Sequence, residues 1–326
     1  MNCTCFSQSV RWSRDCATIR AQCRYSTAIL QEKADAAEWY NLPMNNFFRC
    51  RHIYMLLPRV ATVILALGVA SCSTHQVRND GIEILNAALW TQTAAEYTAN
   101  VIQAYRLASE NLDKALIDPV WTAALEQGDS YTELPPAIVL DLDQTVLDTS
   151  RYNARLVMHY GSHKRDNFAR WCRESTAAAI PGVKNFIDHA VERGVVIIYL
   201  SARHESLRDC TSNNLRTLGL PLPDGERLLL SDGSDSTSKT RHRGRVASQV
   251  RILLLVGDDL NDFFAGSIAD PDTRRMLVYE HANRWGKEWI ILPNPMYGKW
   301  EAALYDYDRG LLPEQRLEQK LQQLQP

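Results

Sequence analysis

The sequence predicts an α/β fold: a doubly wound parallel sheet with a small helical cap or subdomain formed by the helices that precede it. Three short apolar runs predict the central strands, and they lie at Ala137 to Asp143, Val195 to Ser201 and Ile252 to Asp259. Continuous apolar runs of this length are typical of strands buried on both faces of a parallel sheet. Helical segments alternate with these runs, which favours an α/β architecture.

The composition is that of a globular chain with enough apolar residues for a packed core. The chain has 326 residues, of which 45% are hydrophobic and 23% charged, and this excludes a disordered or fibrous protein. With 36 basic and 38 acidic residues, the formal net charge is −2. The chain therefore lacks the cationic excess of a general nucleic-acid binder, and we expect no nucleic-acid partner.

The first 71 residues are expected to lie outside the mature fold. Residues 1–43 show no sustained periodicity, and a start codon assigned too far upstream explains them most simply. Residues 44–71 read as a signal peptide that starts at Met44 or Met55 and contains the apolar run Val60 to Ala70. This run is too short for a membrane span of about 20 residues but has the length of the apolar part of a signal peptide. The alternative to the signal peptide is a buried core helix.

The apolar run ends in Val69-Ala70-Ser71-Cys72, which resembles the bacterial lipobox. We therefore expect Cys72 to be lipidated and residues 72–80 to form a tether to the membrane, where several acyl chains anchor firmly. Ser73 is not the aspartate of an inner-membrane retention signal, which favours an outer-membrane lipoprotein of the bacterial cell envelope, facing the periplasm or the surface. The alternative is a spurious signal on a cytosolic protein.

Cleavage before Cys72 would leave an acidic mature chain. It removes eight basic and four acidic residues, which leaves 28 basic and 34 acidic residues and a net charge of −6. A site for an anionic substrate then needs its own cations. Six of the eight cysteines lie at or before residue 72, so Cys172 and Cys210 alone follow, and the pattern predicts no disulfide framework.

The mature chain divides into a helical segment, residues 81–134, a core, residues 135–312, and a C-terminal surface helix, residues 313–326. Apolar residues at helical spacing predict two helices in the first segment, with Asp118-Pro119 interrupting the pattern and Trp90 and Trp121 in the core. Within the core segment, the remaining expected elements are helices at 183–193 and 207–218 and strands at 275–279 and 289–292.

Polar side chains end each of the three central runs. Asp141-Leu142-Asp143 ends the first, Ser201 the second and Asp258-Asp259 the third. The carboxyl ends of neighbouring parallel strands line one crevice, so we expect these side chains to meet although they are far apart in the sequence. Buried carboxylates repel one another, and a divalent cation relieves this. Oxygen ligands with retained waters favour Mg²⁺ as the cofactor.

Three segments carry a more specific signal, and they follow in order along the chain. Residues 141–150 read DLDQTVLDTS, residues 257–263 read GDDLNDF and residues 292–301 read LPNPMYGKWE. They resemble the class C, or lipoprotein e(P4)-type, acid phosphatases of the haloacid dehalogenase (HAD) superfamily, over roughly residues 82–303. The resemblance implies a HAD-like fold and a Mg²⁺-dependent acid phosphatase or 5'-nucleotidase that hydrolyses phosphomonoesters through an aspartyl-phosphate.

The resemblance also implies a role for each site residue. Asp141 would be the nucleophile, and Asp143 would protonate the leaving oxygen and then activate water. Ser201 would bind the phosphoryl oxygens, and Lys239 would neutralise developing negative charge. The backbone carbonyl of Asp143 would contact the metal, and the place of Asp259 stays open. The expected metal ligands are Asp141, Asp143, Asp258 and Asp262.

Aromatic rings are expected to hold the leaving group of the substrate. The family is associated with aromatic phosphates and nucleoside 5'-monophosphates, including nicotinamide mononucleotide, and stacking on a ring contributes about 1–3 kcal/mol for any base. We assign Trp171 and Trp300 to core packing instead. The expected substrate-binding residues are Phe168, Tyr297, Tyr152 and Arg203.

Two positions depart from the family pattern. Gln144 replaces the glutamate of Asp-x-Asp-Glu-Thr, and Ser201-Ala202-Arg203 replaces Thr-Asn-Arg. Serine keeps the hydroxyl, and Gln144 removes a charge near the metal without deleting a catalytic group. The alternative function is a surface binding or adhesion lipoprotein, for example for haem, on the same scaffold. The family often forms dimers, so a homodimer is a further expectation.

Overall fold

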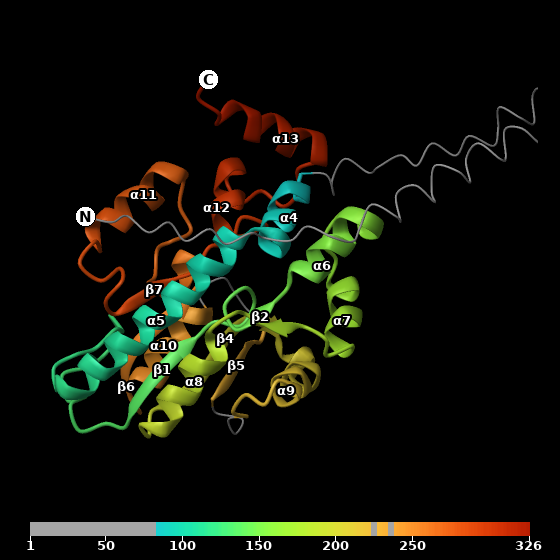
Figure 1. The fold of residues 1–326 in the computed structure, drawn as a ribbon. Helices are drawn as coiled ribbons and strands as arrows, with labels where there is room; N and C mark the ends of the chain where they lie inside the picture. Colours follow the sequence, from blue (N-terminus) through green and yellow to red (C-terminus); the bar gives the residue numbers. More distant parts are fainter. Residues whose placement is uncertain (1–82, 223–226, 234–237) are drawn as a thin grey trace, which may run out of the picture. The chain divides into compact units, whose positions relative to one another are not determined.

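The computed structural model describes residues 83–222, 227–233 and 238–326 (Figure 1). The expected upstream start, signal peptide, lipidated Cys72 and tether all fall on residues 1–82, outside the described residues. None of the helices in the described ranges combines the length and the apolar character needed to cross a bilayer.

A five-stranded parallel sheet forms the centre of the fold, with the strand order β5-β4-β1-β6-β7. The three predicted apolar runs are its three middle strands, which confirms the expected parallel sheet. The sequence analysis did not single out its edge strand β5. The strands are β1 (Pro136–Leu140), β4 (Val196–His204), β5 (Leu228–Ser231), β6 (Arg251–Gly257) and β7 (Trp289–Ile291).

Helices cover both faces of this sheet (Figure 1). Successive side chains of a strand point to opposite faces, so Ile138 and Leu140 join one core cluster and Ala137 and Val139 join the other. The first cluster includes side chains of α5 and α8, and the second includes side chains of α10 and Trp289. The helices concerned are α4 (Leu85–Thr93), α5 (Ala95–Ile117), α8 (Val183–Glu192) and α10 (Ser238–Ala247).

The two N-terminal helices match the predicted pattern, since α5 ends at Ile117 immediately before Asp118-Pro119. Helix α4 contacts α6, whereas α5 packs on the sheet and on α8 within the main core, so α5 is not part of the separate cap that was expected. Trp121 is buried and Trp90 packs against the same cluster, which confirms both as core residues.

The strand expected at residues 275–279 is wrong, because these residues lie within α11 (Pro271–Glu280). The Asp270 side chain accepts hydrogen bonds from the amides of Asp272 and Thr273, and Pro271 occupies the first helical position. Both features start helices, and they outweigh the short apolar run that suggested a strand. The strand expected at residues 289–292 is confirmed as β7.

A smaller group of elements lies beside the carboxyl ends of the strands. The two-stranded antiparallel ribbon of β2 (Leu147–Asp148) and β3 (Ala178–Ala179) belongs to it. The helices of this group are α6 (Ser150–Arg155), which continues into a π-helical turn at Leu156–Tyr160, and α7 (Arg165–Arg173). Helix α9 (Arg208–Thr217) contacts α7 and connects the parallel strands β4 and β5. The chain ends with α12 (Lys299–Ala302), a 3₁₀ turn at Ala303–Tyr305 and α13 (Pro313–Gln322).

A disulfide between Cys172 and Cys210 joins α7 to α9. The sequence pattern did not suggest it, because most cysteines lie in the first 72 residues. The available signal was that these two cysteines remain in a segment predicted to be exported, where disulfides persist.

Candidate active site

Three carboxylates meet at the carboxyl edge of the sheet. Asp141 directly follows β1, Asp258 directly follows β6, and Asp262 ends the short 3₁₀ helix Leu260–Asp262. One carboxylate oxygen of each lies within 4.8 Å of those of the other two. The expectation that Asp141 and Asp258 come together, although more than a hundred positions apart, is therefore confirmed.

The pairing of β1 with β6 explains this convergence. Leu140 is in register with Val256, and the Asp141 amide donates a hydrogen bond to the Val256 carbonyl at 2.9 Å. Asp262 folds back onto the end of β6, where its Oδ2 accepts hydrogen bonds from the amides of Asp258 and Asp259 at 3.1 and 3.0 Å. A Cβ at Gly257 would lie 2.3 Å from this Oδ2, so the approach requires glycine.

Lys239 supplies the local cation that the acidic chain requires. It lies in the first turn of α10, is only 6% exposed, and donates hydrogen bonds from Nζ to Asp141 and, at 2.5 Å, to Asp262 Oδ1. Burial opposes the positive charge, but the carboxylates of Asp141 and Asp262 outweigh it and raise the pKa of Lys239 above its usual range. The ammonium group is therefore charged beside the predicted nucleophile.

The carboxylates carry more negative charge than Lys239 balances. Burial raises the pKa of Asp141 to about 7, with Lys239 opposing and Asp262 adding to the rise. Burial, followed by the charges of Asp141 and Asp262, raises the pKa of Asp258 well above its usual range. A buried set of carboxylate oxygens with uncompensated charge fits a divalent cation, which Asp141, Asp258 and Asp262 could hold.

Asn294 is a site residue that the sequence analysis did not single out. Its Nδ2 donates a hydrogen bond to Asp258 Oδ2 at 2.7 Å, and its Oδ1 accepts one from the Met296 amide. It therefore orients a carboxylate of the cluster. Its place in the segment 292–301, directly after the edge strand, was the available signal.

Asp259, whose place was left open, serves the loop structure. Its Oδ1 accepts a hydrogen bond from the Asn261 amide, and its Oδ2 accepts one from the Lys299 amide at 2.8 Å. Burial would raise the pKa of Asp259, but the charge of Lys299 and these amides lower it overall. Asp259 thus joins the end of β6 to the start of α12.

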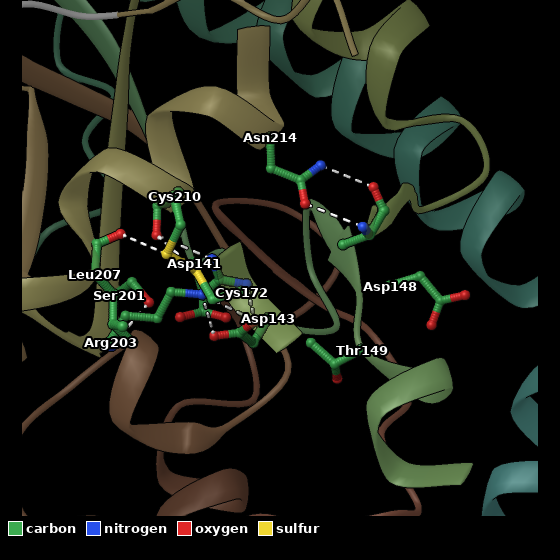
Figure 2. Close-up of polar contacts among 12 residues, drawn as sticks. Asp141, Asp143, Asp148, Thr149, Cys172, Ser201, Arg203, Leu207, Cys210 and Asn214 are labelled. Atoms are coloured by element: carbon green, nitrogen blue, oxygen red, sulfur yellow. Dashed lines mark hydrogen bonds and ion pairs between the residues drawn. A yellow bond between two sulfur atoms is a disulfide. The ribbon is translucent and has the colours of Figure 1, made fainter. Parts of the chain in front are cut away.

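The carboxylate of Asp143 pairs with the guanidinium of Arg203 (Figure 2). Arg203 Nη2 lies 2.7 Å from Asp143 Oδ1, and Arg203 Nε lies 3.0 Å from Asp143 Oδ2. Ser201 is buried, and its Oγ accepts a hydrogen bond from the Arg203 amide at 3.1 Å. Strand β4 continues through Ser201 to His204, so Ser201 does not end the strand as the sequence suggested.

Gln144, which departs from the family pattern, follows Asp143 in a left-handed backbone conformation with φ of 60°. Its side chain is buried, with Nε2 3.9 Å from Met296 Sδ. Within the described residues, its Oε1 has no hydrogen-bond partner.

The predicted substrate rings differ in their surroundings. The Tyr297 hydroxyl lies 3.1 Å from Thr149 Oγ1, and burial, followed by the charges of Asp143 and Asp258, raises the pKa of Tyr297. Phe168 is half-buried, with its ring centroid 5.3 Å from Arg203 Cζ. Tyr152 is only 3% exposed and packs edge-on against Phe168, so it supports that ring.

The two tryptophans assigned to core packing behave differently. Trp171 is 2% exposed and lies in the main core cluster, which confirms its assignment. Trp300 is 42% exposed, so its assignment to the core is wrong. Its Nε1 lies 3.2 Å from the carbonyl oxygens of Asn294 and Tyr297, and the ring therefore braces the loop that carries both residues.

The chain is similar to known proteins over most of its length. The family model described as HAD superfamily, subfamily IIIB (acid phosphatase), matches residues 59–300. The solved structure of the class C acid phosphatase from Bacillus anthracis is 34% identical, with a TM-score of 0.69, over 76% of this chain and 98% of that chain. The class C acid phosphatase from Bacillus anthracis with tungstate bound is also 34% identical, with a TM-score of 0.69, over 77% of this chain and 99% of that chain.

Proposed function

Because the chain belongs to subfamily IIIB of the HAD superfamily and is an acid phosphatase, we propose that it is a Mg²⁺-dependent nucleotidase that works through an aspartyl-phosphate. The observation that carries this proposal is the buried convergence of Asp141, Asp258 and Asp262 around Lys239. Tungstate, an oxyanion like phosphate, is bound in the similar Bacillus anthracis enzyme, which supports an oxyanion site here.

In the first step, an Asp141 carboxylate oxygen attacks the phosphorus atom. The new bond joins Asp141 to phosphorus, while the bond from phosphorus to the leaving oxygen breaks, and that oxygen takes a proton from Asp143. Lys239 Nζ, already within hydrogen-bond distance of Asp141, stabilises the charge on the phosphoryl oxygens together with the Ser201 hydroxyl.

In the second step, Asp143 is a carboxylate and takes a proton from water. The water oxygen bonds to phosphorus, the bond between phosphorus and Asp141 breaks, and phosphate leaves. Asp141 and Asp143 return to their starting states, so the same pair of carboxyl groups serves both steps.

The cofactor in this proposal is Mg²⁺, which fits oxygen donors and offsets the charge of the carboxylates and the phosphoryl group when bound. Asp141, Asp258 and Asp262 would hold it, with the backbone carbonyl of Asp143 as a further donor. Asn294 fixes the orientation of Asp258 through its 2.7 Å hydrogen bond.

The substrates in this proposal are nucleoside 5'-monophosphates and aromatic phosphomonoesters. Phe168 packs on Arg203, the partner of Asp143, and the charge of Asp143 acts on Tyr297, so we assign both rings to the aromatic leaving group. Stacking tolerates different bases, so we expect a broad substrate range. An export signal and a lipidated Cys72 would place the enzyme in the bacterial cell envelope, at the outer membrane. The assembly that we expect is a homodimer.

The test is an assay of the chain from residue 73 on nitrophenyl phosphate and on nucleoside 5'-monophosphates. Chelation should remove activity and Mg²⁺ should restore it, and acid quenching should trap one phosphoryl group on the peptide that contains Asp141. Asp141→Asn should abolish both activity and trapping, while Asp272→Asn, an exposed aspartate on α11, is the control. Activity that survives both chelation and Asp141→Asn would reject the proposal.

A further inference from the structure

Arg203 is a buried cation that the proposed steps do not use. It follows Ser201 by two positions on β4, so both side chains point to the same face of the strand. The Arg203 side chain is only 2% exposed. A buried guanidinium must have its charge and its N–H groups matched by the protein.

Every nitrogen of the guanidinium has a protein partner. Nε donates a hydrogen bond to Asp143 Oδ2 at 3.0 Å, and Nη2 donates one to Asp143 Oδ1 at 2.7 Å. Nη1 donates a hydrogen bond to Thr211 Oγ1 at 3.0 Å. The ring of Phe168 packs on the guanidinium with its centroid 5.3 Å from Cζ. Because Thr211 and Phe168 hold the planar guanidinium in place, its two hydrogen bonds fix the orientation of the Asp143 carboxyl group.

The partners of Arg203 are themselves held by the Cys172–Cys210 disulfide, which lies beside the ion pair in Figure 2. Thr211 is the next residue after Cys210, and Phe168 lies one helical turn before Cys172 on α7. Cys172 Sγ is 3.7 Å from Arg203 Nη1. The half-cystines also form a small apolar cluster against which Phe168 packs.

We propose that Arg203 is a positioning residue that aims the Asp143 carboxyl group at the reacting oxygens, and that the Cys172–Cys210 disulfide holds Arg203 in this place. The inference rests on the proposed function, because it assumes that Asp143 transfers the proton. In this proposal Arg203 acts through Asp143 and not as the substrate ligand that the sequence led us to expect, since a substrate would have to displace Asp143 or Thr211 to reach it.

Opening the disulfide should disturb this contact without unfolding α9. A dithiol gives two electrons and two protons to the S–S bond, which leaves two cysteine thiols and converts the reductant into its own disulfide. Helix α9 stays attached through Asn214, whose side chain exchanges two hydrogen bonds with the backbone of Ala177 at 3.0 and 2.8 Å. Reduction therefore removes the covalent link between α7 and α9.

The first experiment separates positioning from substrate binding by measuring kcat and KM on nitrophenyl phosphate and the inhibition constant of tungstate. Arg203→Gln should lower kcat about 10- to 100-fold, the usual cost of a misplaced catalytic group, with KM and tungstate inhibition nearly unchanged. Arg203→Lys keeps the charge but loses the fork, so it should resemble Arg203→Gln. Arg193→Gln, which removes an exposed ion pair with Asp113, is the matched control.

The second experiment tests the link to the disulfide. Reduction should lower kcat of the natural chain severalfold, and it should have no further effect on Arg203→Gln or on the Cys172→Ser/Cys210→Ser double variant, because the two perturbations act through one contact. Thr211→Val, which removes the oxygen acceptor of Nη1 and leaves both contacts to Asp143 in place, should lower kcat less than Arg203→Gln does. Thermal unfolding of each variant shows that the protein assayed is folded.

Three results would overturn the inference. A raised KM with unchanged kcat in Arg203→Gln would make Arg203 a substrate ligand, and full activity of Arg203→Lys would mean that charge alone suffices. An equal effect of reduction on the natural chain and on Arg203→Gln would separate the disulfide from Arg203. Failure of the proposed function would show differently, as activity that remains in Asp141→Asn.

Discussion

Asp141→Asn is expected to change the pH dependence of stability of the metal-free protein. Burial raises the pKa of Asp141 from its ordinary value of 3.8 to about 7, so the folded state holds a proton that the unfolded state releases. This contribution to stability is complete below about pH 4 and is lost as the pH rises through about 7. The difference of about three pKa units corresponds to about 4 kcal/mol.

The assay is urea unfolding in the presence of chelator at pH 4 and at pH 8. The natural chain should lose about 4 kcal/mol more than Asp141→Asn between these two values, because only the natural chain has this carboxyl group to ionise. Saturating Mg²⁺ should remove most of the difference, since a cation stabilises the ionised form. Equal losses of stability in the two proteins would show that the buried carboxyl group with the raised pKa is not that of Asp141.

Three further predictions follow from the same cluster. Lys239→Met should lower kcat about 10²- to 10³-fold in a steady-state assay, because it removes the ammonium group beside Asp141; a loss confined to KM would contradict this role. Gly257→Ala should lower the free energy of unfolding by about 1–3 kcal/mol in urea titrations, since the new Cβ would lie 2.3 Å from Asp262 Oδ2, and unchanged stability would show that the loop adapts freely. Asn294→Ala should weaken metal binding about 10- to 100-fold in calorimetric titrations, because Asp258 loses its orienting hydrogen bond; an unchanged affinity would mean that Asp258 is oriented without it.

The middle of the fold could be predicted from the sequence because its strands are buried on both faces. Such strands are continuous apolar runs, and their carboxyl ends must lie at one edge, which is why Asp141 and Asp258 were expected to meet. The edge of the sheet gave weaker signals. Strand β5 was missed although the still shorter edge strand β7 was predicted. The apolar part of α11 is as short as a strand, so only the start of the helix, at Asp270 and Pro271, distinguishes it.

The site was predictable where the chemistry lies at strand ends and unpredictable where it depends on tertiary packing. Lys239 lies in a stretch that is merely basic, and only the family resemblance singled it out. The Cys172–Cys210 disulfide depends on how α7 and α9 pack together, and the Arg203–Asp143 ion pair depends on the pairing of β4 with β1. No periodicity of the sequence encodes either contact. Trp300 was assigned to the core wrongly because a tryptophan can stabilise a loop through hydrogen bonds of its indole N–H while its ring stays exposed.

The strand order has a consequence for how the enzyme is assembled. Strand β1 is the first strand of the sheet to be synthesised, yet it lies between β4 and β6, and Ile138 pairs with Leu254. Closing the loop between β1 and β6 must precede any contact between Asp141 and Asp258, so a nascent chain that stops before residue 251 contains Asp141 without the other two carboxylates of the cluster. The three-carboxylate cluster therefore forms only late in synthesis, after Asp262 has been made.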